Sequence, residues 1–127
     1  MELLPRLWMV LASIGGLMAV AAGAFGAHGA SNPEAKAWLQ TGAQYQLIHA
    51  LAVFACVMLW RLGGTSAQFA AWLFLAGGFV FSGTLYLMAF GLPRWFGAIT
   101  PVGGVLLLLG WAVMAWTALT GARSTLV

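Results

Sequence analysis

Acidic residues are nearly absent from this sequence: among 127 residues there are only two, Glu2 and Glu34. Catalysis by a pair of carboxylates needs two acids that lie close together, and these two are far apart in the chain. Neither acid lies inside a long apolar run, so the chain lacks the membrane-embedded carboxylate with which small multidrug-resistance exporters exchange protons for cationic drugs. These absences argue against carboxylate catalysis and against that class of transporter, and we expect no enzyme activity.

Metal-binding side chains are also scarce. Cys56 is the single cysteine, so it forms no internal disulfide, and we interpret it as an inert core residue. His28 and His49 are the only two histidines, whereas structural zinc normally takes four protein ligands and catalytic zinc three. A bis-histidine haem between the first two spans is geometrically open, but nothing in the pattern argues for it. The sequence therefore predicts no metal and no cofactor.

Apolar residues dominate what is present: 63% of the chain is hydrophobic and 6% is charged. A spanning helix needs roughly 20 mostly apolar residues, and four runs approach or exceed this length, at residues 7–27, 43–60, 67–90 and 99–120. The turn at residues 62–66 is very short, so the second and third runs should be antiparallel neighbours. The sequence predicts an all-α membrane protein, with residues 1–127 forming a single domain as an antiparallel bundle of four transmembrane helices.

A helix start is predicted shortly after the first run. Either Asn32 caps the helix with Pro33 at its first position, or Ser31 and Glu34 form a capping box. The residues after this start place Trp38 on an apolar face, where it can anchor at the membrane surface. We expect a short interfacial helix here, between spans 1 and 2. Gly42 is either the bend into the second span, or the helix runs straight through it.

Basic residues fall at or beyond the ends of the predicted spans. Arg6, Arg61 and Arg123 lie on one side of the membrane, and Lys36 and Arg94 lie on the other. Because cytoplasmic loops carry the excess of Lys and Arg, this count favours both termini in the cytoplasm. The net charge of +3 is small and dispersed, so we expect no binding of nucleic acid.

Small residues recur at helical spacing in three of the four runs. In lipid, close backbone approach through small residues is a main source of helix association. The residues predicted to pack helices are Gly15, Gly16, Ala19, Gly23, Gly26, Gly78, Gly83, Gly103 and Gly104.

Polar side chains gather on the membrane side that holds the first and third loops. The candidate ligand or polar cluster is His28, Tyr45, Gln46, His49, Ser82, Tyr86, Arg94 and Thr100. Tyr45, Gln46 and His49 are three and four residues apart, so they can share one helical surface. An imidazole this deep needs partners, because an unpaired polar group in lipid costs several kcal/mol. The available partners for His49 are Ser82, Tyr86 and Thr100.

Two interpretations of His49 stay open: a neutral histidine that links helices, or a ligand, proton-relay or quinone-facing group. The simplest interpretation of His28 is that its side chain caps the carbonyls at the end of the first span. Arg94 is an anchor at headgroup level, or else forms a salt bridge or phospholipid contact that fixes its loop. The seven tryptophans divide into an interfacial belt, namely Trp8, Trp38, Trp60, Trp95 and Trp116, and two that pack or face lipid, Trp72 and Trp111.

Four motifs occur in order along the chain: GAFGAHG at 23–29, YQLIHAL at 45–51, FSGTLY at 81–86 and RWFGAITPVGG at 94–104. Together they resemble the small bacterial inner-membrane family catalogued as domain of unknown function 423, which includes YgdD and YwdK; mitochondrial transmembrane protein 256 is similar. The resemblance covers nearly the whole chain. It implies four spans and a bacterial inner-membrane location, and it names no substrate.

Three functions remain in competition. The first is a non-catalytic protein that associates with itself or serves as an accessory subunit of a membrane complex. The second is a lipid- or quinone-binding protein that uses the polar cluster, since an amphiphile needs a greasy groove with a few polar groups. The third is a small transporter. The expected partners are accordingly membrane lipids, a second copy of the chain, or a larger membrane complex.

Overall fold

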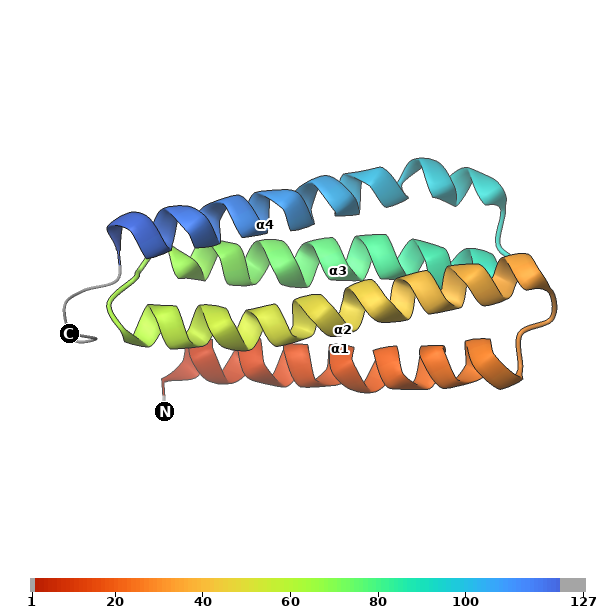
Figure 1. Cartoon of the computed structure of the whole chain (residues 1–127), viewed down its shortest axis with the longest axis horizontal. Helices are drawn as coiled ribbons and strands as arrows, with labels where there is room; N and C mark the ends of the chain where they lie inside the picture. Colours follow the sequence, from red (N-terminus) through yellow and green to blue (C-terminus); the bar gives the residue numbers. More distant parts are fainter. Residues whose placement is uncertain (1, 122–127) are drawn as a thin grey trace.

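The computed structural model describes residues 2–121, which form four long α-helices and one short 3-10 helix (Figure 1). The helices are α1 (Leu3–His28), α2 (Pro33–Arg61), α3 (Ala67–Ala89), η1 (Arg94–Ala98) and α4 (Thr100–Thr120). Within this range there is no β-strand, and all four long helices have the length and apolar composition needed to cross a membrane. The predicted all-α membrane fold is confirmed.

The start of α2 matches the first of the two predicted capping schemes. The side-chain oxygen of Asn32 accepts a hydrogen bond from the backbone N–H of Ala35 at 2.8 Å, and Pro33 occupies the first helical position. The alternative capping box is not formed, because Glu34 pairs instead with Arg94. The Asn32 cap therefore fixes where α2 begins. It does not use the Glu34 carboxylate, which binds Arg94.

The interfacial helix predicted between the first two spans is not a separate element, and of the two alternatives at Gly42 the continuous helix is the one observed. α2 continues unbroken from Pro33 through Gly42 to Arg61, so the interfacial segment and the second span are one helix. A single glycine costs only about 1 kcal/mol inside a helix, which does not break it. Here it also has a packing role, because a Cβ at Gly42 would lie 2.6 Å from the ring of Tyr86.

The four helices are not packed equally against one another. Each helix packs mainly against the next one in the chain, and α1 makes no contact with α4 (Figure 1). α3 lies between α2 and α4, while α1 rests chiefly on α2. The bundle is therefore open along one side, between α1 and α3.

Trp8 is the largest buried side chain of the core, with 0% of its surface exposed. Its ring stands edge-on to the rings of Trp60 and Trp72, at 5.7 and 6.3 Å between centroids. The prediction that Trp8 belongs to an interfacial belt is thus wrong, because α1 turns this residue toward α2 and α3. Cys56 is fully buried with its sulfur 3.4 Å from that of Met114, as expected for an inert core residue.

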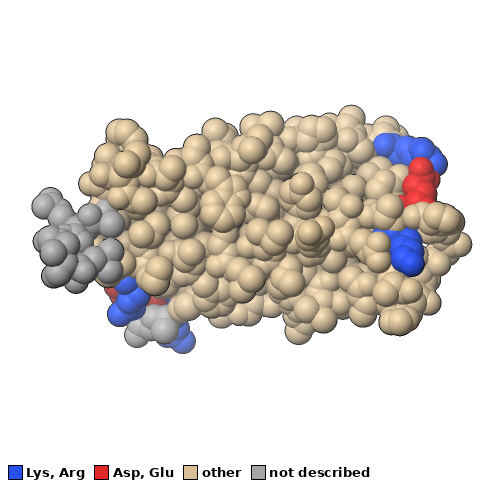
Figure 2. All heavy atoms as spheres, viewed as in Figure 1, with Lys and Arg blue, Asp and Glu red and all other residues tan. Residues whose placement is uncertain are grey.

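Among residues 2–121, charged side chains are confined to the two ends of the bundle. Figure 2 shows blue and red only at the ends of the face it draws, with an uncharged band between. The charged residues described are Glu2, Arg6, Glu34, Lys36, Arg61 and Arg94. This distribution suits a protein whose middle lies in hydrocarbon. Arg123, which contributed to the predicted orientation, lies outside the described residues.

Candidate functional site

A groove with a volume of about 490 Å³ opens between α1 and α3, with α2 as its floor. We call it the lateral groove. Its size falls in the range of ~300–1,000 Å³ typical of small-molecule sites. Its lining is almost entirely apolar and consists of Leu11, Ala12, Ile14, Gly15, Met18, Gln46, His49, Ala50, Trp72, Phe74, Leu75, Ala76, Gly78, Phe79, Gly83 and Tyr86. A bulky apolar molecule in the membrane could therefore enter it sideways.

Glycines on α3 give the lateral groove its depth. A Cβ built at Gly78 or at Gly83 would meet no atom within 4 Å, so these positions border open space. Gly15 on α1 faces the groove from the other wall, where the amide nitrogen of Gln46 would lie 3.7 Å from its Cβ. The groove exists because these positions carry no side chain.

Gln46 and Tyr86 form the polar part of the lateral groove. The Tyr86 hydroxyl donates to the side-chain oxygen Oε1 of Gln46 at 2.7 Å. This bond turns the amide nitrogen Nε2 toward α1, and Nε2 has no hydrogen-bond acceptor among residues 2–121. Gln46 lies close to the middle of α2, so its unpaired donor is far from both ends of that helix.

His49 is held by two hydrogen bonds that together indicate its tautomer. Nδ1 lies 2.6 Å from the backbone oxygen of Tyr45, and Nε2 lies 3.0 Å from the indole nitrogen of Trp111. An indole N–H can only donate, so Nε2 accepts and the hydrogen of a neutral ring is on Nδ1, which donates to the carbonyl. The arrangement matches the interpretation of His49 as a neutral histidine that links helices.

The partners predicted for His49 are wrong. Ser82, Tyr86 and Thr100 do not bond to it, and its partner is Trp111, which was expected only to pack or face lipid. Nδ1 carries the ring hydrogen, and Nε2 already accepts a hydrogen bond from Trp111. Neither ring nitrogen therefore has a free lone pair for a metal or a haem iron. The signal that could have identified Trp111 is its position halfway along the last span, level with His49.

The remaining hydroxyls of the predicted cluster link helices outside the lateral groove. Ser82 donates to the backbone oxygen of Gly42 at 2.7 Å and so ties α3 to α2. The Thr100 hydroxyl lies 2.6 Å from that of Thr84 and ties α4 to α3. The Tyr45 ring packs on Phe81, with centroids 4.7 Å apart. Of the eight predicted cluster residues, only Gln46, His49 and Tyr86 line the groove.

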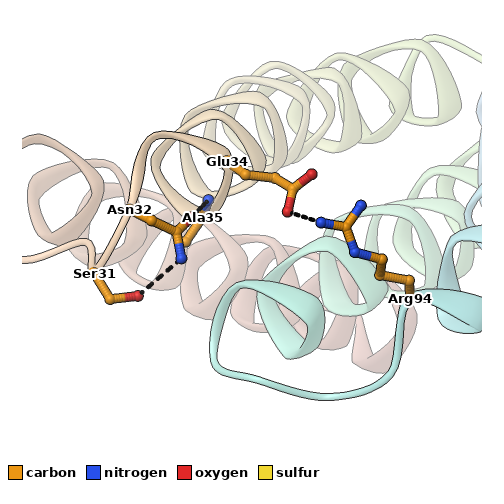
Figure 3. Close-up of polar contacts among 5 residues, drawn as sticks. All are labelled: Ser31, Asn32, Glu34, Ala35 and Arg94. Carbon is orange, nitrogen blue, oxygen red and sulfur yellow. Dashed lines mark hydrogen bonds and ion pairs between the residues drawn. The ribbon is translucent and has the colours of Figure 1, made fainter.

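Arg94 and His28 lie far from the groove, at the end of the bundle. Arg94 forms a salt bridge with Glu34, which is one of its predicted roles (Figure 3). Its guanidinium carbon also lies 5.7 Å from the centre of the Trp38 ring, a cation–π contact. The His28 side chain is exposed at the end of α1 and makes no hydrogen bond within the part of the chain that is described, so it does not form the predicted cap. Nor do the described residues contain a group of three His, Cys, Asp or Glu side chains that could hold a metal.

The family model described as "Protein of unknown function (DUF423)" matches residues 22–104, which contain all four sequence motifs and the Gln46–Tyr86 pair. The chain belongs to this family. This chain is 40% identical over 114 residues to the UPF0382 membrane protein YwdK of Bacillus subtilis (strain 168), covering 86% of this chain and 93% of YwdK.

Two further relatives come from Escherichia coli and Haemophilus influenzae. The UPF0382 inner membrane protein YgdD of Escherichia coli (strain K12) is 40% identical over 113 residues, covering 86% of each chain. A UPF0382 membrane protein of Haemophilus influenzae is 39% identical over 112 residues, covering 86% of this chain and 90% of the relative. No solved structure matches this chain. With four spanning helices and relatives of this kind, the DUF423 protein is a multi-pass protein of the bacterial inner membrane.

The small residues predicted to pack helices divide into two sets in this DUF423 protein. Gly23 and Gly26 approach α2, where a Cβ would lie 3.5 Å from that of Ala43 and 3.1 Å from that of Leu39. In the same set, Ala19 is buried, Gly15 contacts Gln46, and Gly103 and Gly104 face Phe81. Gly16, Gly78 and Gly83 form the other set, because a Cβ there would contact nothing.

Proposed function

We propose that this protein is a non-catalytic membrane protein that holds a small carbonyl-bearing amphiphile, of the isoprenoid quinone class, in the lateral groove. The observation that carries this proposal is the unpaired amide nitrogen of Gln46, which faces an apolar groove near the middle of α2. The proposal extends one of the functions expected from the sequence, and it narrows the site to Gln46, Tyr86 and the glycines opposite them.

The amide of Gln46 sets the chemistry of the occupant. An N–H group without an acceptor costs several kcal/mol in hydrocarbon, where no water can replace the missing bond. The oxygen of this amide already accepts a hydrogen bond from Tyr86, whereas the nitrogen still lacks an acceptor. A bound molecule must therefore offer an acceptor and not a donor. A carbonyl oxygen on an otherwise apolar molecule meets that requirement.

The depth of Gln46 separates quinones from phospholipids. The hydrocarbon of a bilayer is about 30 Å thick, so the ester carbonyls of a phospholipid lie about 15 Å from its centre. Gln46 lies near the centre, and a phospholipid that reached it with a carbonyl would have to pull its headgroup into the hydrocarbon. A quinone ring on an isoprenoid tail has no charged headgroup and can bring a carbonyl to this depth.

The side chains of the groove support holding a molecule and not converting it. Its described lining contains no carboxylate and no thiol, and both ring nitrogens of His49 are already engaged. The Tyr86 hydroxyl is likewise directed at Gln46. A carrier or reservoir role for the amphiphile fits this set of groups.

Self-association is the second candidate, and the open glycine faces favour it. Gly78 and Gly83 border empty space on α3, and a helix of a second copy or of a larger complex could pack there through close backbone contact. The small residues on α1 are less available, because Gly23 and Gly26 already approach α2 within the chain. The two candidates thus compete for the same surface.

Quinone titration of the protein in phosphatidylcholine nanodiscs tests the first candidate. A decyl-substituted benzoquinone that enters the groove should quench the fluorescence of Trp72, which lines it. Gly78→Leu places a side chain in the groove at a position where an added Cβ meets no atom within 4 Å, so the fold should survive while affinity falls about tenfold or more, equivalent to about 1.4 kcal/mol. Gly16→Leu is the matched control, since it adds the same side chain to open space outside the groove.

Gln46→Leu removes the proposed donor and should weaken quinone binding about fivefold, the scale of one net hydrogen bond of about 1 kcal/mol. Quenching that fails to saturate, or that is equal in the wild type and the Gly78→Leu variant, would contradict the proposal. Sedimentation of the same samples reports on the second candidate: a wild-type dimer that Gly78→Leu separates, without any quinone effect, would favour self-association.

A further inference from the structure

A second cavity, of about 430 Å³, lies at the end of the bundle where the loop before α2 meets the loop after α3. We call it the end pocket. Phe25, Phe90 and Leu92 supply apolar walls, and Ser31, Glu34 and Arg94 supply polar groups. The end pocket shares no lining residue with the lateral groove, so binding there is independent of the proposed function.

The end pocket presents both signs of charge side by side. Glu34 at the start of α2 and Arg94 at the start of η1 point toward each other across it (Figure 3). Their contact uses one guanidinium nitrogen, Nη2, and one carboxylate oxygen, Oε1. A guanidinium carries five N–H donors and a carboxylate has two oxygens, so both groups keep capacity for a further partner. Both side chains are also accessible, at 75% for Arg94 and 45% for Glu34.

The depth of this charge pair matches that of lipid headgroups. Glu34 precedes Gln46 by twelve residues of continuous helix, which is about 18 Å at 1.5 Å per residue. Half the hydrocarbon thickness is about 15 Å, so Glu34 lies just outside the hydrocarbon when Gln46 lies at its centre. Trp38, beneath the Arg94 guanidinium, is a residue type that prefers this level.

Apolar side chains line the end pocket beside the charge pair. The rings of Phe25 and Phe90 are 5.3 Å apart between centroids and join α1 to the end of α3. A molecule seated in the end pocket would therefore place charged groups on Glu34 and Arg94 and an acyl chain along these rings. This is the layout of a phospholipid.

We infer that the end pocket binds the headgroup of a phospholipid that carries a primary ammonium beside its phosphate, the phosphatidylethanolamine class. The phosphate accepts hydrogen bonds from the free N–H groups of Arg94. The ammonium donates to the unused oxygen of Glu34. A headgroup without a cation, as in phosphatidylglycerol, leaves the Glu34 carboxylate facing its phosphate, and a choline headgroup has no N–H to donate.

Native mass spectrometry with added lipid tests this inference on the full-length protein in mild detergent. The probes are phosphatidylethanolamine, phosphatidylglycerol and phosphatidylcholine with the same palmitoyl and oleoyl chains. We expect the wild type to bind the ethanolamine lipid about threefold to fivefold more tightly than either other lipid, the scale of one exposed charge pair. Glu34→Gln removes the partner of the ammonium and should bring that ratio close to one.

Two further variants separate lipid recognition from a purely structural salt bridge. The exchange of Glu34→Arg with Arg94→Glu keeps an ion pair but reverses its direction, so it should keep thermal stability and lose the preference for ethanolamine. Lys36→Gln changes a neighbouring charge that does not line the end pocket and should leave the preference intact. The inference is overturned if the wild type shows no such preference, or if Glu34→Gln or the charge exchange retains it.

Discussion

The indole nitrogen of Trp111 donates a hydrogen bond to Nε2 of His49 over 3.0 Å, and this bond ties α4 directly to α2. The two helices otherwise touch little, because α3 lies between them. The same bond requires an unprotonated Nε2 and so keeps the ring in the form that donates through Nδ1 to Tyr45. One side-chain pair thus fixes both a helix contact and the state of the only buried histidine described.

Trp111→Phe should destabilise the protein by about 1–3 kcal/mol, because it leaves Nε2 of His49 without its donor while preserving an aromatic ring against Phe74. Loss of helicity during titration with sodium dodecyl sulfate measures this change. A double-mutant cycle with His49→Leu isolates the pair, and the two substitutions should be clearly non-additive. Simple additivity would show that the bond contributes nothing to stability.

Gly103→Ala should be strongly destabilising, because its Cβ would lie 2.4 Å from the backbone nitrogen of Phe81 and force α3 and α4 apart. Overpacking of this kind typically costs about 1–3 kcal/mol. Gly104→Ala is the control on the adjacent residue, where a Cβ lies 3.8 Å from the Phe81 ring in ordinary contact. The same detergent titration should separate the two variants, and equal stabilities would argue against close packing at Gly103.

Tyr86→Phe should retain the ring that packs on Gly42 and remove the hydroxyl that orients Gln46. We expect a loss of stability of about 1–2 kcal/mol, from the acceptor left unpaired on Gln46, together with weaker quinone quenching. Ser82→Ala, which removes a different bond to the same stretch of α2, controls for general loosening. Ser82→Ala should reduce stability without changing quinone affinity. If Ser82→Ala and Tyr86→Phe lower quinone affinity equally, Tyr86 has no specific role in the groove.

The architecture could be predicted from the sequence because lipid imposes one strong condition, which is that every apolar run of spanning length becomes a helix. The point that the sequence left undecided lay at Gly42. A glycine in a sequence is equally consistent with a bend or with a close contact, and only the Tyr86 ring, 44 residues further along, decides for the contact. Trp8 was misassigned for a related reason, because its place near a span end suggests an interface whereas its burial depends on which way α1 faces.

The candidate site was predictable only in part. Gln46, His49 and Tyr86 could be chosen because polar side chains are rare within the spans, and the three do line one groove. The assignment of partners failed because hydrogen bonds between helices depend on their relative rotation, which spacing within one helix does not determine. The Glu34–Arg94 contact joins residues 60 positions apart, and the sequence offered it only as one interpretation among several.

The most direct test of the central claim is native mass spectrometry of the protein released from its own membranes, with the Gly78→Leu and Gly16→Leu variants beside the wild type. We predict one bound molecule with the mass of an isoprenoid quinone on each wild-type and Gly16→Leu chain, and none on Gly78→Leu. A wild-type chain that carries only phospholipid, or a quinone that remains equally on Gly78→Leu, would contradict the claim that the lateral groove is the site.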